Sequence, residues 1–149
     1  MSKNRLTRRE ERETVFKLLF SASFRTEETP AQILEEYEED NEIVCSDYVR
    51  STFLGASAYL KEADGLIEAD SKNWKASRLS LVTSALLHLS VYEMLETDVP
   101  PKVAINEAVE LAKIYDDAAA APFINGILNR IGREAGVLAG MPVQRPEEK

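Results

Sequence analysis

Four arginines near the start of the chain, Arg5, Arg8, Arg9 and Arg12, are the side chains best placed to do chemistry. A guanidinium group binds phosphate or carboxylate through a planar set of donors and stays charged in any protein. At about 100° per residue, Arg8, Arg9 and Arg12 lie in line with apolar residues one and two turns further along a helix. They therefore continue a core-facing stripe beyond the point where a core can follow. This spacing predicts guanidiniums that either overhang the end of a helix bundle or hold an anionic ligand.

Side chains suited to catalysis or metal binding form no recognisable pattern. The single histidine, His88, has no partners at the spacing of a zinc site or a nucleophile–base pair, and we interpret it as a surface or half-buried helix residue. Cys45 has no neighbouring base that would lower the pKa of its thiol. No glycine-rich phosphate loop is present. We therefore predict a protein that is not an enzyme and uses no metal or cofactor.

Charge is distributed unevenly along the chain. The formal net charge is −8, which argues against a general nucleic-acid binder. Residues 1–25 nevertheless hold seven Lys and Arg against three Glu, whereas residues 26–47 hold nine acids and no base. Since the Debye length in cellular salt is about 8 Å, a ligand at the N-terminal end would experience mainly the local field. A basic end on an acidic body can therefore still hold a polyanion.

The spacing of apolar residues predicts an all-α protein. No stretch alternates with a period of two, and Gly and Pro separate long segments with helical spacing. Thr7 and Thr29 each have a Glu or Gln three residues later, which predicts helix starts, and Ser46 or Asp47 predicts a third. Further helical segments are expected over residues 65–70, 79–95, 102–115 and 119–133.

The segment 79–95 is apolar nearly all round, which is typical of a helix at the centre of a bundle. We expect about six or seven helices in two small subbundles that share this helix. A single domain would cover residues 1–135, since a chain of 149 residues is long enough for one core. Glycine, proline and charge over residues 136–149 predict a flexible C-terminal tail.

The helix expected over residues 102–115 has two separate faces. Small residues on one face imply close approach to another helix. Val103 and Ile114 are apolar but lie among polar residues on the opposite face. We interpret these two residues as covered by a loop.

Two sequence blocks resemble the NusB family of bacterial transcription antitermination factors. They are Val-Ala-Ile-Asn-Glu-Ala-Val-Glu-Leu-Ala-Lys at 103–113 and Phe-Ile-Asn-Gly-Ile-Leu at 123–128. Trp74 with Arg78-Leu79, the run 91–95 and an arginine-bearing first helix fit the same pattern in family order, so that the resemblance spans about residues 8–132. It implies binding of boxA-type single-stranded RNA in nascent ribosomal RNA leaders, together with the ribosomal protein NusE. In such a complex RNA polymerase is kept from terminating early.

The resemblance also implies roles for single residues. The four arginines would bind phosphates, and Phe20, Tyr115 and Phe123 would stack on splayed bases. Asn125 would read a base edge or brace a neighbouring loop. The protein partner would dock around Thr83, Val99 and Lys102.

The chain departs from the family pattern at three places. Asp116 stands where the family usually has glycine, and Thr83 stands where an acidic residue is common. Residues 118–122, Ala-Ala-Ala-Ala-Pro, replace a polar start of the final helix, and alanine cannot accept hydrogen bonds from the free N–H groups there. These departures affect residue-level details of binding and leave the fold prediction unchanged.

No apolar run approaches the roughly 20 residues that span a bilayer, and the charged N-terminus lacks the apolar segment of a signal peptide. We expect a cytoplasmic protein with no membrane contact, either monomeric or a weak homodimer.

One alternative to RNA binding is a protein-only scaffold that docks a partner through the acidic stretch or the Val103 and Ile114 patch, without RNA. The overall acidity favours this alternative, and the charge asymmetry favours RNA.

Overall fold

The computed structural model describes residues 6–71 and 79–138, and within these residues all regular secondary structure is α-helical. The all-α prediction is confirmed. Arg5, Trp74, Arg78 and residues 139–149 of the expected tail lie outside the described residues. The helices are α1 (Arg8–Ala22), α2 (Pro30–Asn41), α3 (Asp47–Ala58), α4 (Leu60–Asp70), α5 (Leu81–Glu96), α6 (Pro101–Tyr115) and α7 (Ala120–Glu134).

Local capping signals begin the first helices where the sequence predicted. Thr7 and Thr29 both form complete capping boxes, in which the threonine hydroxyl accepts from the backbone N–H three residues later. Ser46, and not Asp47, caps α3. No side chain caps α7 at Ala119, as the alanine run led us to expect. The short helix predicted over 65–70 is longer in the structure. It is α4, which begins at Leu60 after a break in the helix at Tyr59.

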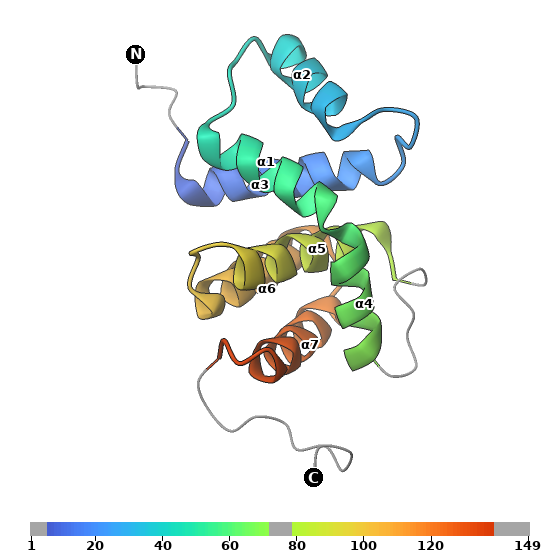
Figure 1. Cartoon of the computed structure of the whole chain (residues 1–149), viewed down its shortest axis with the longest axis vertical. Helices are drawn as coiled ribbons and strands as arrows, with labels where there is room; N and C mark the ends of the chain where they lie inside the picture. Colours follow the sequence, from blue (N-terminus) through green and yellow to red (C-terminus); the bar gives the residue numbers. More distant parts are fainter. Residues whose placement is uncertain (1–5, 72–78, 139–149) are drawn as a thin grey trace.

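The helices form two groups stacked along the long axis of the molecule (Figure 1). Helices α1, α2 and α3 lie at one end, and α4, α6 and α7 lie at the other. Helix α5 packs against α1 and α3 on one side and against α4, α6 and α7 on the other. Its side chains are buried around most of its circumference, including Leu86, Leu87 and Val91 at 0% exposure. The prediction of two subbundles that share this helix is confirmed.

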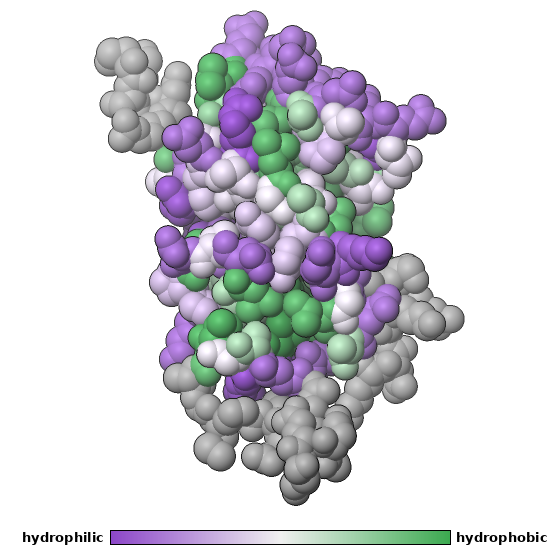
Figure 2. Space-filling model, viewed as in Figure 1, coloured by the Kyte–Doolittle hydropathy of each residue, from purple (hydrophilic) through white to green (hydrophobic). Residues whose placement is uncertain are grey.

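The surface is hydrophilic over α2, at the top of the molecule in Figure 2. This helix carries many of the acidic residues of segment 26–47. On α6, Val103 and Ile114 are 42% and 67% exposed, so the expectation of a covering loop is wrong. Among the described residues, no helix has the length and apolar character needed to cross a membrane.

The packed chain continues three residues beyond the domain boundary expected at 135. Gly136 has a φ of 80°, and the N–H of Val137 donates to the Gly132 carbonyl, which closes α7 with a Schellman-type turn. A Cβ added at Gly132 would lie 2.6 Å from Leu138 and 3.1 Å from the Met94 sulfur. Residues 136–138 therefore belong to the folded body.

Two helical glycines should respond oppositely to alanine. A Cβ at Gly55 would lie 2.0 Å from the Tyr92 hydroxyl, whereas a Cβ at the exposed Gly65 meets nothing within 4 Å. We expect Gly55→Ala to destabilise by about 1–3 kcal/mol through overpacking. Gly65→Ala should stabilise by about 0.5–1 kcal/mol through helix propensity. Urea unfolding of both variants measures the difference, and equal effects would contradict the close approach of α3 and α5.

Candidate functional site

The guanidinium of Arg12 is buried in an ion pair with Glu93. Its Nε donates to Glu93 Oε1 at 2.8 Å, and the two side chains are 6% and 1% exposed. This pair joins α1 to α5 and thus the two ends of the molecule. The prediction that the arginines extend beyond the core is therefore wrong for Arg12. Its stem lies in the stripe as expected, but a carboxylate within the apolar α5 draws the charged group inward.

Tyr48 of α3 completes this buried cluster. Its hydroxyl donates to Glu93 Oε2 at 2.5 Å, so that Glu93 receives hydrogen bonds from α1 and α3. Burial and the neighbouring Glu93 carboxylate raise the pKa of Tyr48, which keeps the phenol protonated as a donor. The cluster therefore fixes the relative positions of three helices through one fully buried carboxylate.

Arg9 pairs with Glu107 of α6. Its Nε and Nη2 donate to the two carboxylate oxygens at 3.0 and 2.7 Å, a bidentate arrangement. The Arg9 side chain is 64% exposed and that of Glu107 is 12% exposed. The hydrogen bond from Arg9 lowers the pKa of the Glu107 carboxyl. Arg9 is therefore held in one orientation while much of its surface still faces solvent.

Arg8 lies at the same end of α1, with its guanidinium over an aromatic ring. Its guanidinium carbon is 4.1 Å from the centre of the Tyr48 ring, and its Nε donates to Glu11 at 3.1 Å. The side chain remains 60% exposed. Arg8 and Arg9 thus form an accessible cationic edge, whereas Arg12 is buried and not accessible to a ligand.

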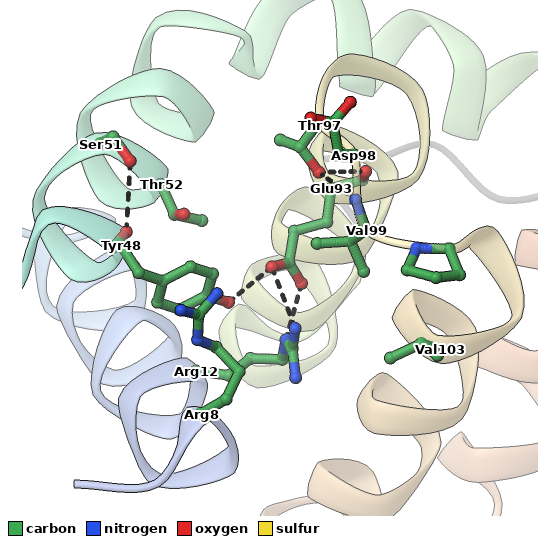
Figure 3. Close-up of a pocket in the computed structure, with 11 residues that line it drawn as sticks. Arg8, Arg12, Tyr48, Ser51, Thr52, Glu93, Thr97, Asp98, Val99 and Val103 are labelled. Carbon is green, nitrogen blue, oxygen red and sulfur yellow. Dashed lines mark hydrogen bonds and ion pairs between the residues drawn. The ribbon is translucent and has the colours of Figure 1, made fainter.

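A cavity of about 500 Å³ opens beside Arg8. It lies between α1, α3, the end of α5 and the start of α6. Figure 3 shows Arg8 and Tyr48 on one side, Val99 and Val103 on the other, and Glu93 between them. Its lining combines two arginines, two acids, hydroxyl groups and an apolar wall.

Two of the predicted stacking residues, Phe20 and Tyr115, belong to one row of aromatic rings. Phe16 lies 5.1 Å from Tyr115 and 6.5 Å from Phe20, and Phe20 lies 5.3 Å from Phe24. Tyr115 and Phe24 are 36% and 58% exposed at the two ends of the row. The Tyr115 hydroxyl donates to Glu13, which holds this ring in place. Sequence analysis did not select Phe24, although it follows Phe20 by one helical turn.

Phe123 and Asn125 lie apart from this row, on α7. Phe123 is half-buried and lines a smaller cavity of about 280 Å³ with Thr83 and Asp116. Asn125 is exposed, and its carbonyl accepts a hydrogen bond from the Asn129 amide within the same helix. No bracing of a neighbouring loop by Asn125 is seen in the described part of the chain.

The three predicted partner-contact residues do not form one surface. Thr83 lies near the start of α5 and is 7% exposed, whereas Val99 and Lys102 follow the end of that helix, roughly 20 Å away along its axis. The Thr83 hydroxyl donates to Asp116 Oδ2 at 2.6 Å. Two departures from the family pattern are therefore in contact with each other. The backbone of Asp116 is extended (φ −114°), so no glycine is required there.

The residues set aside in the sequence analysis have structural partners. His88 Nε2 lies 2.7 Å from Asp64 Oδ1 and links α5 to α4. Cys45 is 8% exposed, and burial raises the pKa of its thiol. No group of three or more metal-ligating side chains occurs among the described residues.

Comparison with known proteins agrees with this architecture. A model of the NusB family matches residues 9–133. The chain belongs to the NusB family. The transcription antitermination protein NusB of Acetivibrio thermocellus is 39% identical over 146 residues, which cover 95% of this chain and 99% of the relative.

Solved structures of the NusB family share the fold. A NusB structure from T. maritima aligns with a TM-score of 0.78 at 39% identity, covering 87% of this chain and 92% of that one. A crystal structure of the antitermination factors NusB and NusE in complex with dsRNA aligns with a TM-score of 0.71 at 29% identity, covering 83% and 94%.

Sequence analysis missed the carboxylates that organise the site. Glu107 falls on the polar face of the helix expected over residues 102–115, yet the whole residue is only 9% exposed. Glu93 carried a usable signal, because it is the only acidic residue within the apolar segment 79–95. A lone carboxylate in a buried helix needs a charged partner, and the nearest unexplained cations were the arginines of the first helix.

Loss of the buried carboxylate should be costly. We expect Glu93→Gln to destabilise by about 3–5 kcal/mol, because it leaves the buried Arg12 with only the longer contact to Glu107, at 3.7 Å, as a counter-ion. The matched control is Glu110→Gln, which removes an exposed pair with Lys113 and should cost about 0.5 kcal/mol or less. Chemical denaturation of both variants measures this. Similar losses in the two variants would show that Arg12 is not held as described.

The Arg9–Glu107 pair should contribute to acid sensitivity. Because the pKa of Glu107 is lowered in the folded state, its contribution is present above the ordinary glutamate pKa of about 4.3 and is lost as pH falls through the lowered value. Glu107→Gln should therefore reduce the stability lost between about pH 5 and pH 3. Urea midpoints across this range measure the effect, with Glu110→Gln as the comparison. If Glu107→Gln loses as much stability as the parent when the pH falls, Glu107 is not paired with Arg9 as described.

Proposed function

We propose that this protein binds RNA and acts, together with a NusE-type ribosomal protein, as a transcription antitermination factor in the cytoplasm. In this role it would hold a boxA-type segment of a nascent ribosomal RNA leader and help RNA polymerase read through terminators. The mechanism is assembly, and it requires no bond-making step, metal or cofactor. Family membership supports this role, as does the related complex of NusB and NusE with dsRNA.

The observation that carries the proposal is the pair of exposed guanidiniums at the start of α1. Arg8 and Arg9 are fixed by Glu11, Tyr48 and Glu107, so little side-chain entropy is lost when they bind a phosphate. Each uses only part of its donor set on the protein. Two fixed, exposed cations on neighbouring residues suit consecutive phosphates of a strand.

The aromatic row formed by Tyr115, Phe16, Phe20 and Phe24 offers a second kind of contact. Its exposed ends, Tyr115 and Phe24, have faces on which unpaired bases can stack. A duplex exposes phosphates but keeps its bases stacked inside, so this row would add affinity only for a single strand. We therefore propose that single-stranded RNA binds more tightly than the same sequence in a duplex.

Removal of the two exposed arginines should change the salt dependence of RNA binding. For the parent, log K should fall linearly with log salt concentration. Arg8→Ala with Arg9→Ala should reduce the magnitude of that slope by about 1.4, since each phosphate contact contributes about 0.7 with single strands. Fluorescence anisotropy with a labelled boxA-type RNA across a salt series measures the slope.

The control variant combines Lys61→Ala with Arg133→Ala, which removes the same charge from α4 and α7. It should leave the slope nearly unchanged. Arg12 is kept in both variants because its removal would unpair Glu93 inside the protein. Equal slopes for the two double variants would reject the arginine assignment. A parent that binds no RNA would favour the protein-only scaffold.

A further inference from the structure

We propose that the cavity beside Arg8 is a pocket for one unstacked nucleobase of the bound RNA. This inference rests on the proposed function and adds to it a site that reads or anchors a base. The cavity of about 500 Å³ exceeds the size of any single base and is open on one side, so a base attached to a strand can enter.

The walls of the pocket suit a flat, partly apolar ring. On one side the Arg8 guanidinium lies over the Tyr48 ring, and its outer face is a planar surface of the kind on which bases stack. On the other side Val99 and Val103 form an apolar wall (Figure 3), and Pro100 also lines the cavity there. A base between these walls would have one face against the Arg8 guanidinium and the other against the apolar wall.

The charges of the lining favour a neutral group over a phosphate. The guanidiniums of Arg8 and Arg12 are balanced by the carboxylates of Glu93 and Asp98. A phosphate placed here would lie near two carboxylates, one of them fully buried. A base carries no net charge, so it avoids this repulsion. Phosphates of the same strand would remain outside, at the exposed edges of Arg8 and Arg9.

The pocket also offers hydrogen-bonding groups at the edge of a bound ring. The Ser51 hydroxyl of α3 donates to the Tyr48 carbonyl, so its oxygen can serve as an acceptor, and the Asp98 carboxylate is a further acceptor. Thr52 also lines the cavity but is only 4% exposed. The Thr97 hydroxyl is already used, because it donates to the Glu93 carbonyl and accepts from the Val99 N–H. A base whose edge meets these groups is held in position as well as stacked.

The neighbouring arginines explain why a nucleic acid fits better than an apolar protein side chain. A protein anchor would gain from the apolar wall but would cover the part of the Arg8 guanidinium that its hydrogen bond to Glu11 leaves in contact with solvent. A nucleotide supplies both partners at once, a ring for the guanidinium face and a phosphate for its edge. We therefore infer that Arg8 contacts a base and the adjoining phosphate together.

The test combines pocket-filling variants with abasic RNA. Val103→Phe and Ser51→Phe fill the cavity from opposite walls, and both residues have exposed side chains, so the fold should be retained. Val44→Phe is the control, since Val44 is 85% exposed and does not line the cavity. The probe is a short boxA-type single-stranded RNA in which one base at a time is replaced by an abasic ribose. Anisotropy gives the Kd, and circular dichroism checks helicity.

We expect one abasic position to weaken binding to the parent and to Val44→Phe by about tenfold, as for loss of one stacked base. Both filling variants should bind the intact RNA about tenfold more weakly and lose all sensitivity to that position. Their salt slopes should match the parent, because no phosphate contact is removed.

The outcomes separate this inference from the proposed function. If the parent binds RNA with the expected salt slope but the filling variants bind like Val44→Phe, the pocket holds no base and the proposed function stands. Weaker binding with a reduced salt slope in the filling variants would mean that the cavity holds a phosphate, which overturns the inference. Weaker binding of purified NusE-type protein, with RNA binding unchanged, would assign the cavity to a protein partner. A parent that binds no RNA rejects both proposals.

Discussion

The buried ion pair between Arg12 and Glu93 is the interaction on which the rest of the structure depends. Removing two charges from water costs several kcal/mol per ion, and this cost is recovered only with good geometry and further hydrogen bonds. Here Tyr48 supplies the additional bond, so Glu93 is bound from α1 and α3 at once. Apolar packing around α5 is non-directional, whereas this cluster requires α1 and α3 to bring Arg12 and Tyr48 to the same carboxylate.

The same constraint determines which arginines remain available to a ligand. Three guanidiniums follow one another along α1, and each has a carboxylate partner, Glu11, Glu107 or Glu93. What distinguishes them is depth. Glu93 lies inside the bundle, and its ion pair with Arg12 keeps that guanidinium buried. Glu11 and Glu107 lie nearer the surface and orient Arg8 and Arg9 without covering them. Carboxylates thus act here as positioning groups for cations, which is why an acidic protein can still present a defined cationic edge.

Local signals predicted the fold well, and long-range pairs limited the prediction of the site. The capping boxes at Thr7 and Thr29 depend on residues three apart, and the burial of α5 follows from its own composition. Arg12 and Glu93 are 81 positions apart, and Arg9 and Glu107 are 98 apart, so no local pattern connects them. Helical angles placed Arg12 on the core-facing stripe, but they could not show that the core extends far enough to bury its charge.

The charge distribution also bears on how selective binding can arise. A net charge of −8 repels nucleic acid over distances shorter than the screening length, and much of the negative charge is concentrated on α2. Two exposed guanidiniums give a modest attraction, which is sequence-independent and weakens as salt rises. Net affinity under cellular conditions therefore requires short-range contacts that salt does not screen. Stacking on aromatic or guanidinium faces has this property, and it is available only where bases are unpaired. For the proposed RNA-binding role, an acidic body with a small cationic edge would make base contacts the deciding contribution and would favour strands whose bases are free over duplex RNA.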